Sequence, residues 1–202
     1  MSDIKAVIFD YGGVLAEEGF SNGLQALARE QKLAVDNMTA EGMRAVYDSG
    51  FVLGKGSAAD FWSLLRERTG LRGRDQDLKR RILEGFVLRP AMLELAEKLR
   101  SSGYVTAILS DQTDWLDELD QRDHFYHCFD RIYNSYYSGK GKRDPSHFSD
   151  VAKDLKMPPS SVVFVDDNAT NVDAAAGAGM LAIQYIDQAS FIQRLSALMP
   201  HD

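Results

Sequence analysis

The chain has 202 residues, enough for one hydrophobic core with a smaller inserted unit. Hydrophobic residues make up 45% and charged residues 26%, as in an ordinary globular protein. The formal net charge of -7 argues against a broad nucleic-acid-binding face, because such faces carry clustered lysine and arginine.

The sequence also bears on the location of the protein and on the chemistry open to its cysteine. No apolar run approaches the ~20 residues of a membrane-spanning helix, and the opening MSDIKAV lacks the build of a signal peptide. A cytoplasmic location is therefore expected. The one cysteine, Cys128, excludes an internal disulfide and a cage of several thiolates.

Apolar runs rich in β-branched residues predict the strands. In chain order they are residues 5–9, 104–109, 129–134, 161–165 and 180–186, with 129–134 the weakest. Helical patterns lie between them, beginning with a helix that starts at Pro90 and ends before Ser101-Ser102-Gly103. The later helices are expected at 114–121, 145–156, 169–178 and 189–199. This alternation predicts an α/β fold with a doubly wound, mostly parallel sheet.

Residues 20–86 interrupt the alternation. They contain no convincing strand and are expected to form a helical insertion after the first strand, with Phe61, Trp62, Leu64 and Leu65 packed inside it. Its amphipathic windows are residues 21–32, 39–49, 58–69 and 75–86.

Polar residues follow three of the predicted strands. They are Asp10, the pair Ser110-Asp111, and the triplet Asp166-Asp167-Asn168. In a parallel sheet these clusters meet at the carboxyl edge, where α/β proteins bind ligands. Carboxylates gathered there would repel one another unless a cation lay between them, and Mg²⁺ is commonly held by one or two carboxylates together with water and substrate phosphate.

A basic loop and a hydroxyl complete this pattern. Lysine from Gly139-Lys140-Gly141-Lys142-Arg143 and the hydroxyl of Ser110 could hold phosphate oxygens. A carboxylate nucleophile, a metal, a hydroxyl and a lysine suit phosphoryl transfer, in which catalysis is mostly positioning and charge neutralisation.

Four ordered motifs resemble those of the haloacid dehalogenase superfamily, in particular its phosphatase-like members with a helical cap after the first strand. VIFDYGGVL is similar to the first motif, VTAILSDQT to the second, SGKGKRDPSHF to the third and VVFVDDNATNVDAAAGAGM to the fourth. The resemblance covers nearly the whole chain. It implies a hydrolase core at 1–15 and 88–202 and a cap at 16–87.

The same resemblance implies roles for individual residues. Asp10 would be the nucleophile that forms an aspartyl-phosphate. Ser110 and the backbone amide of Asp111 would bind the phosphoryl group, and Lys142 would neutralise nucleophile and phosphate.

The resemblance also implies a Mg²⁺ site and a small phosphorylated metabolite as the partner. Asp167, Asp10 and the carbonyl of Gly12 would bind the metal with support from Asp166. Nothing in the sequence indicates the oligomeric state or the identity of the substrate.

Gly12 departs from the family pattern, because most phosphatases of the family have an aspartate there as general acid and base. Such catalysis contributes typically ~10²–10⁴-fold. Some capped relatives with glycine at this position are sugar-phosphate phosphatases, so the hypothesis is hydrolysis of a phosphate monoester, with a sugar phosphate as one option. Asp111, Glu17 and Glu18 are candidates for the missing proton carrier by proximity in sequence alone. Arg143 is a second departure, because the family usually has proline after the motif lysine.

Two other functions stay open. A 2-haloacid dehalogenase also lacks the second aspartate, but its fourth motif would carry serine and asparagine where this chain has Asp166-Asp167. A catalytically weak or silent relative that binds a phosphorylated ligand is supported by Gly12 alone.

Several features have simpler explanations. Asp10 could belong to a turn, Lys142 could be solvated, and Asp166-Asp167-Asn168 could cap the next helix. The stretch 54–59 matches a dinucleotide fingerprint but lacks a preceding strand, so a turn with Ser57 as helix cap is favoured. His124, His127 and Cys128 could suggest a metal, yet their aromatic neighbours favour ordinary packing.

Overall fold

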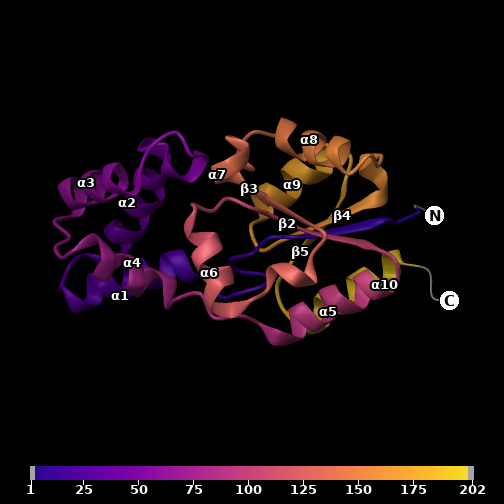
Figure 1. The fold of residues 1–202 in the computed structure, drawn as a ribbon, viewed down its shortest axis with the longest axis horizontal. Coiled ribbons are helices and arrows are strands. Elements are labelled where there is room, and N and C mark those ends of the chain that lie inside the picture. Colours follow the sequence, from indigo (N-terminus) through magenta and orange to yellow (C-terminus); the bar gives the residue numbers. More distant parts are fainter. Residues whose placement is uncertain (1–2, 200–202) are drawn as a thin grey trace.

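The computed structural model describes residues 3–199 and contains a five-stranded parallel sheet in the order β3-β2-β1-β4-β5 (Figure 1). Its strands are β1 (Ala6–Phe9), β2 (Val105–Ser110), β3 (Arg131–Asn134), β4 (Val162–Asp166) and β5 (Leu181–Gln184). The expected α/β fold is confirmed, and the predicted runs differ from these strands by at most two residues at either end.

Helices cover both faces of the sheet. In Figure 1, α5 (Pro90–Ser101) and α10 (Gln188–Leu198) lie on one side, while α8 (Ser146–Asp154) and α9 (Ala169–Gly177) lie on the other. Side chains of β1 alternate accordingly, because successive residues of a strand point to opposite faces. Val7 and Phe9 pack into the larger core with α5, α6 (Trp115–Asp123) and α10, whereas Ala6 and Ile8 pack with α8 and α9.

The helical cap is inserted after β1, as expected, and lies at one end of the molecule (Figure 1). It contains α1 (Gly19–Glu30), α2 (Val35–Asp48), the short η1 (Phe51–Leu53), α3 (Ala58–Thr69) and α4 (Asp75–Leu83). The limits 1–15, 16–87 and 88–202 of core and cap stay a prediction. Among the helices of residues 3–199, none has both the length and the apolarity needed to cross a membrane.

Local signals explain where several helices begin. Ser57 accepts a hydrogen bond from the Asp60 amide while the Asp60 carboxylate accepts one from Ser57, which is a capping box for α3. Asn168 caps α9 through a single hydrogen bond that its side-chain oxygen accepts from the Thr170 amide. The single-turn elements α7 (Ser135–Ser138), η2 (Tyr126–Cys128) and η3 (Pro159–Ser161) were not predicted, because one turn carries no periodic pattern.

Aromatic residues join the cap to the core. The Trp62 ring stacks on Trp115 at the start of α6, with centroids 5.7 Å apart. Phe51 meets Trp115 edge-on at 5.5 Å, and the Ser135 hydroxyl donates to the Val52 carbonyl at 2.7 Å. Phe61, Trp62 and Leu65 are buried in the cap, but Trp62 also packs across the interface, which the sequence did not reveal. These contacts hold the cap over the carboxyl edge of the sheet.

Candidate active site

The polar strand ends meet at the carboxyl edge of the sheet. Phe9 pairs with Ile108 of β2 and with Val165 of β4, so Asp10 and Asp166 follow in the same row, and Ser110 lies one residue further along β2. The Ser110 hydroxyl donates to Asp10 Oδ1 at 2.6 Å. The parallel register therefore brings together side chains that are 100 residues apart in sequence.

Lys142 bridges two of the carboxylates. Its Nζ lies 2.7 Å from Asp10 Oδ2 and 2.6 Å from Asp166 Oδ2, and its side chain is only 3% exposed. Lys140, the other lysine of the basic loop, instead pairs with exposed Asp150 at 2.5 Å. The structure thus places Lys142, as predicted, and not Lys140 among the strand ends.

The buried charges alter the proton affinity of the site. Burial, opposed by the Lys142 charge and reinforced by that of Asp166, raises the pKa of Asp10 to about 8. Burial alone would lower the pKa of Lys142, but the carboxylates of Asp10, Asp166 and Asp111 raise it above its usual value. A proton or a cation is therefore favoured beside Asp10.

Asp167 completes an acidic group with Asp10 and Asp166. One carboxylate oxygen from each lies within 4.8 Å of the others. Burial and then the Asp166 charge raise the pKa of Asp167, so its oxygens also favour a positive partner. Gly13 has a φ of +81°, and a Cβ built on it would lie 2.3 Å from Asp167 Oδ2. The turn after β1 thus leaves room for this carboxylate, and the group could hold a hard divalent cation.

Asp166 is fixed in place by its neighbours. Asn171 Nδ2 donates to its Oδ2 at 3.0 Å, and the Asn168 amide donates to its Oδ1 at 2.8 Å. Asn168 and Asn171 thus organise this carboxylate.

Asp111 faces the cap and the basic loop. Its Oδ2 accepts a hydrogen bond from the Tyr47 hydroxyl of α2 at 2.6 Å, and its Oδ1 accepts one from the Lys142 amide at 2.9 Å. The Arg143 guanidinium lies 3.4 Å from the centroid of the Tyr47 ring. Asp111 therefore ties cap to core, and sequence reasoning missed its partner Tyr47 because nothing local links the two.

Glu18 occupies the space beside Gly12. A Cβ atom built on Gly12 would lie 2.8 Å from Glu18 Oε2. Burial, partly offset by the hydrogen bond from Ser21, raises the pKa of Glu18, and the Asp167 charge adds to the rise. Its neighbour Glu17 is exposed and pairs with Arg89 at 3.1 Å. Of these adjacent glutamates, only Glu18 points into the site.

A cavity of about 340 Å³ opens over these groups, between cap and core. Its floor carries Asp10, Ser110, Lys142 and Asp167, and the Glu18 side chain lines it too. Apolar and polar side chains line the rest of the cavity. The apolar ones are Phe20, Met43, Val46, Val52 and Trp115, and the polar ones include Ser21, Tyr47, Gln112, Thr113 and Arg143. The site suits a small organic ligand with one charged end.

Residues 4–179 match the family model described as haloacid dehalogenase-like hydrolase. The chain belongs to this hydrolase family. The resemblance noted in the sequence is thereby confirmed, and with it the enzyme class. The stretch 54–59, which lies in a turn and the start of α3, is no dinucleotide site: Gly54 has a φ of +63° and Ser57 caps the helix.

Named relatives of this haloacid dehalogenase-like hydrolase include two of similar length. It is 26% identical over 198 residues to a sesquiterpene phosphatase of Aspergillus oryzae, covering 96% of both chains. It is 25% identical over 206 residues to the D-ribitol-5-phosphate phosphatase of Bacteroides thetaiotaomicron, covering 97% of this chain and 98% of the relative. It is also 33% identical over 111 residues to rat bifunctional epoxide hydrolase 2, but that match covers 52% of this chain and 20% of the longer protein.

Solved structures share the fold. A haloacid dehalogenase family enzyme of Bacteroides thetaiotaomicron in a magnesium complex superposes with a TM-score of 0.76 at 22% identity, covering 95% of this chain and 99% of the other. The same enzyme with magnesium and inorganic phosphate gives a TM-score of 0.74 at 22% identity, covering 94% and 98%.

Proposed function

We propose that the protein is a Mg²⁺-dependent phosphatase that hydrolyses a small phosphate monoester through an aspartyl-phosphate on Asp10. The observation that carries the proposal is the contact of Asp10 with both the Ser110 hydroxyl and the Lys142 ammonium, beside the pair Asp166-Asp167. The phosphatase names of two full-length relatives support it.

In the first half-reaction, the phosphoryl group is transferred to Asp10, and each residue has a separate role. A carboxylate oxygen of Asp10 attacks phosphorus, and the bond from phosphorus to the ester oxygen breaks. Ser110 and the backbone amide of Asp111 hold phosphoryl oxygens, while Lys142 offsets the negative charge of nucleophile and phosphate.

The cation belongs to the same centre. Asp10, Asp167 and the Gly12 carbonyl, with Asp166, would hold Mg²⁺. When bound, it would neutralise charge on the transferred phosphoryl group. These residues fit a divalent cation, because three carboxylates lie close together and the one buried ammonium, that of Lys142, balances only part of their negative charge.

Glu18 is the proton carrier that replaces the missing aspartate. Its Oε2 atom lies 2.8 Å from where a Cβ at position 12 would stand, and its side chain lines the cavity. It gives a proton to the departing alcohol and later accepts one from the water that hydrolyses the aspartyl-phosphate. Asp111 is less suited, because Tyr47 and the Lys142 amide already engage its oxygens.

The cavity lining bears on the class of substrate. Phe20 and Met43 offer aromatic and hydrocarbon surface, whereas Ser21, Tyr47 and Gln112 offer polar groups. This lining suits the organic part of a sugar phosphate as well as that of an aryl or isoprenoid phosphate.

The test is a phosphate-release screen of sugar, aryl and isoprenoid phosphates, with and without Mg²⁺. Release that needs Mg²⁺ and is abolished by Asp10→Asn is expected. The control is Asp173→Asn on the exposed face of α9, which should keep full activity. Activity that survives Asp10→Asn contradicts the mechanism. Release of halide from 2-haloacids without Mg²⁺, in place of phosphate release, would identify the dehalogenase alternative.

A further inference from the structure

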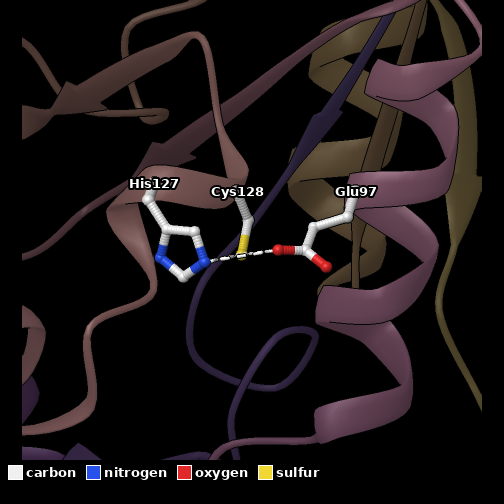
Figure 2. A group of neighbouring side chains, drawn as sticks. All are labelled: Glu97, His127 and Cys128. Atoms are coloured by element: carbon white, nitrogen blue, oxygen red, sulfur yellow. Dashed lines mark hydrogen bonds and ion pairs between the residues drawn. The ribbon is translucent and has the colours of Figure 1, made fainter.

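Three metal-ligating side chains meet at a second place in the core (Figure 2). Glu97 projects from α5 toward His127 and Cys128 of η2. Because η2 precedes β3 in the chain and the Cys128 carbonyl bonds to Thr106 near the start of β2, this group lies at the amino edge of the parallel sheet. It is therefore at the opposite edge from the catalytic carboxylates.

The three ligand atoms surround a common point. Cys128 Sγ lies 3.5 Å from Glu97 Oε1 and 3.6 Å from His127 Nε2, and that nitrogen lies 3.3 Å from the same Glu97 oxygen. The Cys128 thiol and a protonated His127 Nε2 can both donate to Glu97 Oε1, which places the sulfur and the nitrogen side by side around one oxygen.

The separations match those around tetrahedral zinc. Zinc binds sulfur at ~2.3 Å, histidine nitrogen at ~2.0–2.1 Å and carboxylate oxygen at ~2.0–2.2 Å. At the tetrahedral angle, these lengths place sulfur roughly 3.6 Å from each lighter ligand atom and nitrogen roughly 3.4 Å from oxygen. The three observed distances agree with these values to within about 0.1 Å.

The backbone around the ligands is held by other groups. The Arg100 guanidinium donates to the His127 carbonyl, and the Thr106 hydroxyl donates to the Cys128 carbonyl at 3.1 Å. The Arg100 charge is matched by Asp130, whose Oδ1 lies 3.3 Å from Arg100 Nε. The adjacent ligands His127 and Cys128 are thus positioned without help from a metal.

We propose that Glu97, His127 and Cys128 form a Zn²⁺ site with water as the fourth ligand. The mixture of thiolate, imidazole and carboxylate is a typical zinc donor set. The side chains of Glu97 and His127 are 51% and 68% exposed, which leaves an open side for water, while Cys128 is buried. Binding breaks the S–H bond, forms a zinc–sulfur bond and releases the thiol proton to solvent. The bound ion links η2 to α5.

Cobalt spectroscopy tests the site on the full chain. With excess Mg²⁺ present to occupy the catalytic carboxylates, Co²⁺ is added, and the thiolate-to-cobalt charge-transfer band is measured before and after displacement by Zn²⁺. Because Cys128 is the only cysteine, any such band must come from it. We expect one Co²⁺ per chain and loss of the band in Cys128→Ser.

Ligand variants make the test specific. Glu97→Gln and His127→Asn alter exposed side chains and should each weaken Co²⁺ binding at least ~10-fold, since even indirect neighbours of a metal contribute that much. The matched control is His124→Asn, three residues from His127 in a left-handed conformation that asparagine tolerates, and its affinity should be unchanged. The proposal is overturned if the native chain shows no charge-transfer band, or if both ligand variants bind Co²⁺ as tightly as the native chain does. It is also overturned if one Co²⁺ is shared by two chains.

Discussion

Glu18 and Gly12 share one small space in the active site. The Glu18 Oε2 atom lies 2.8 Å from where a Cβ of residue 12 would stand, so a side chain at position 12 and the present position of Glu18 exclude each other. At the position where the resemblance implies an aspartate, this chain has Gly12, and a glutamate six residues further along lies beside it.

Loss of the Glu18 proton donor should slow the hydrolysis of phosphate esters to an extent that depends on the leaving group. Glu18→Gln is expected to lower kcat for alkyl phosphates by ~10²–10⁴-fold, because general acid catalysis is lost. Turnover of an aryl phosphate with an acidic phenol should fall far less, since that leaving group needs little protonation. Steady-state rates for matched ester pairs check this, with Glu17→Gln as control. Equal losses for both esters would contradict a proton-transfer role, whereas no native turnover of either would contradict the phosphatase itself.

The carboxylate can also be moved back to position 12. Gly12→Asp alone is expected to reduce activity, because its Cβ would stand 2.8 Å from Glu18 Oε2 and displace the end of that flexible side chain. Gly12→Asp combined with Glu18→Ala should recover part of the alkyl-phosphatase activity. The two variants are compared by kcat and by thermal unfolding. A double variant no more active than Gly12→Asp would show that the two positions are not interchangeable.

Lys142 should matter for folding as well as for catalysis. Lys142→Met leaves the buried Asp10 and Asp166 without their ammonium partner, and breaking a buried pair in this way costs about 3–5 kcal/mol of unfolding free energy. Phosphatase activity should be lost. Lys140→Met is the matched control, because an exposed ion pair contributes about 0–1 kcal/mol. Urea unfolding of both variants measures the difference, and equal stabilities would contradict the buried pairing.

His147 should make the fold sensitive to mild acid. Burial lowers the pKa of His147 below the usual 6.5, with Asp111, Asp150 and Asp144 opposing the shift and Lys140 reinforcing it. Since the unfolded chain takes up the proton more readily, the stabilising contribution is present above pH ~6.5 and is lost as the pH falls. Urea unfolding of the native chain and of His147→Gln between pH ~5 and ~8 checks this. If the unfolding free energy changes with pH equally in both proteins, His147 is not the source of the acid sensitivity.

The strands and the motif residues could be predicted because their signals are local. An apolar run such as 161–165 carries its own strand pattern, and Ser57 caps α3 through residues three positions away. Once the sheet is parallel, the position of Asp10, Ser110 and Asp166 at one edge follows from their place at the carboxyl end of each strand or directly after it. The choice of Lys142 over Lys140 rested on its spacing to Asp144-Pro145, and the structure places Lys142 among these carboxylates.

Residue chemistry and pattern therefore determined the sheet, the cap and the acidic centre from the sequence alone. Only the tertiary structure decided that Glu18 and not Glu17 faces Gly12, that Tyr47 meets Asp111 across the cavity, and that Glu97 joins His127 and Cys128. Such contacts depend on how a loop turns and how one helix is rotated against another. No spacing along the chain encodes that geometry, because it arises only when the side chains pack together.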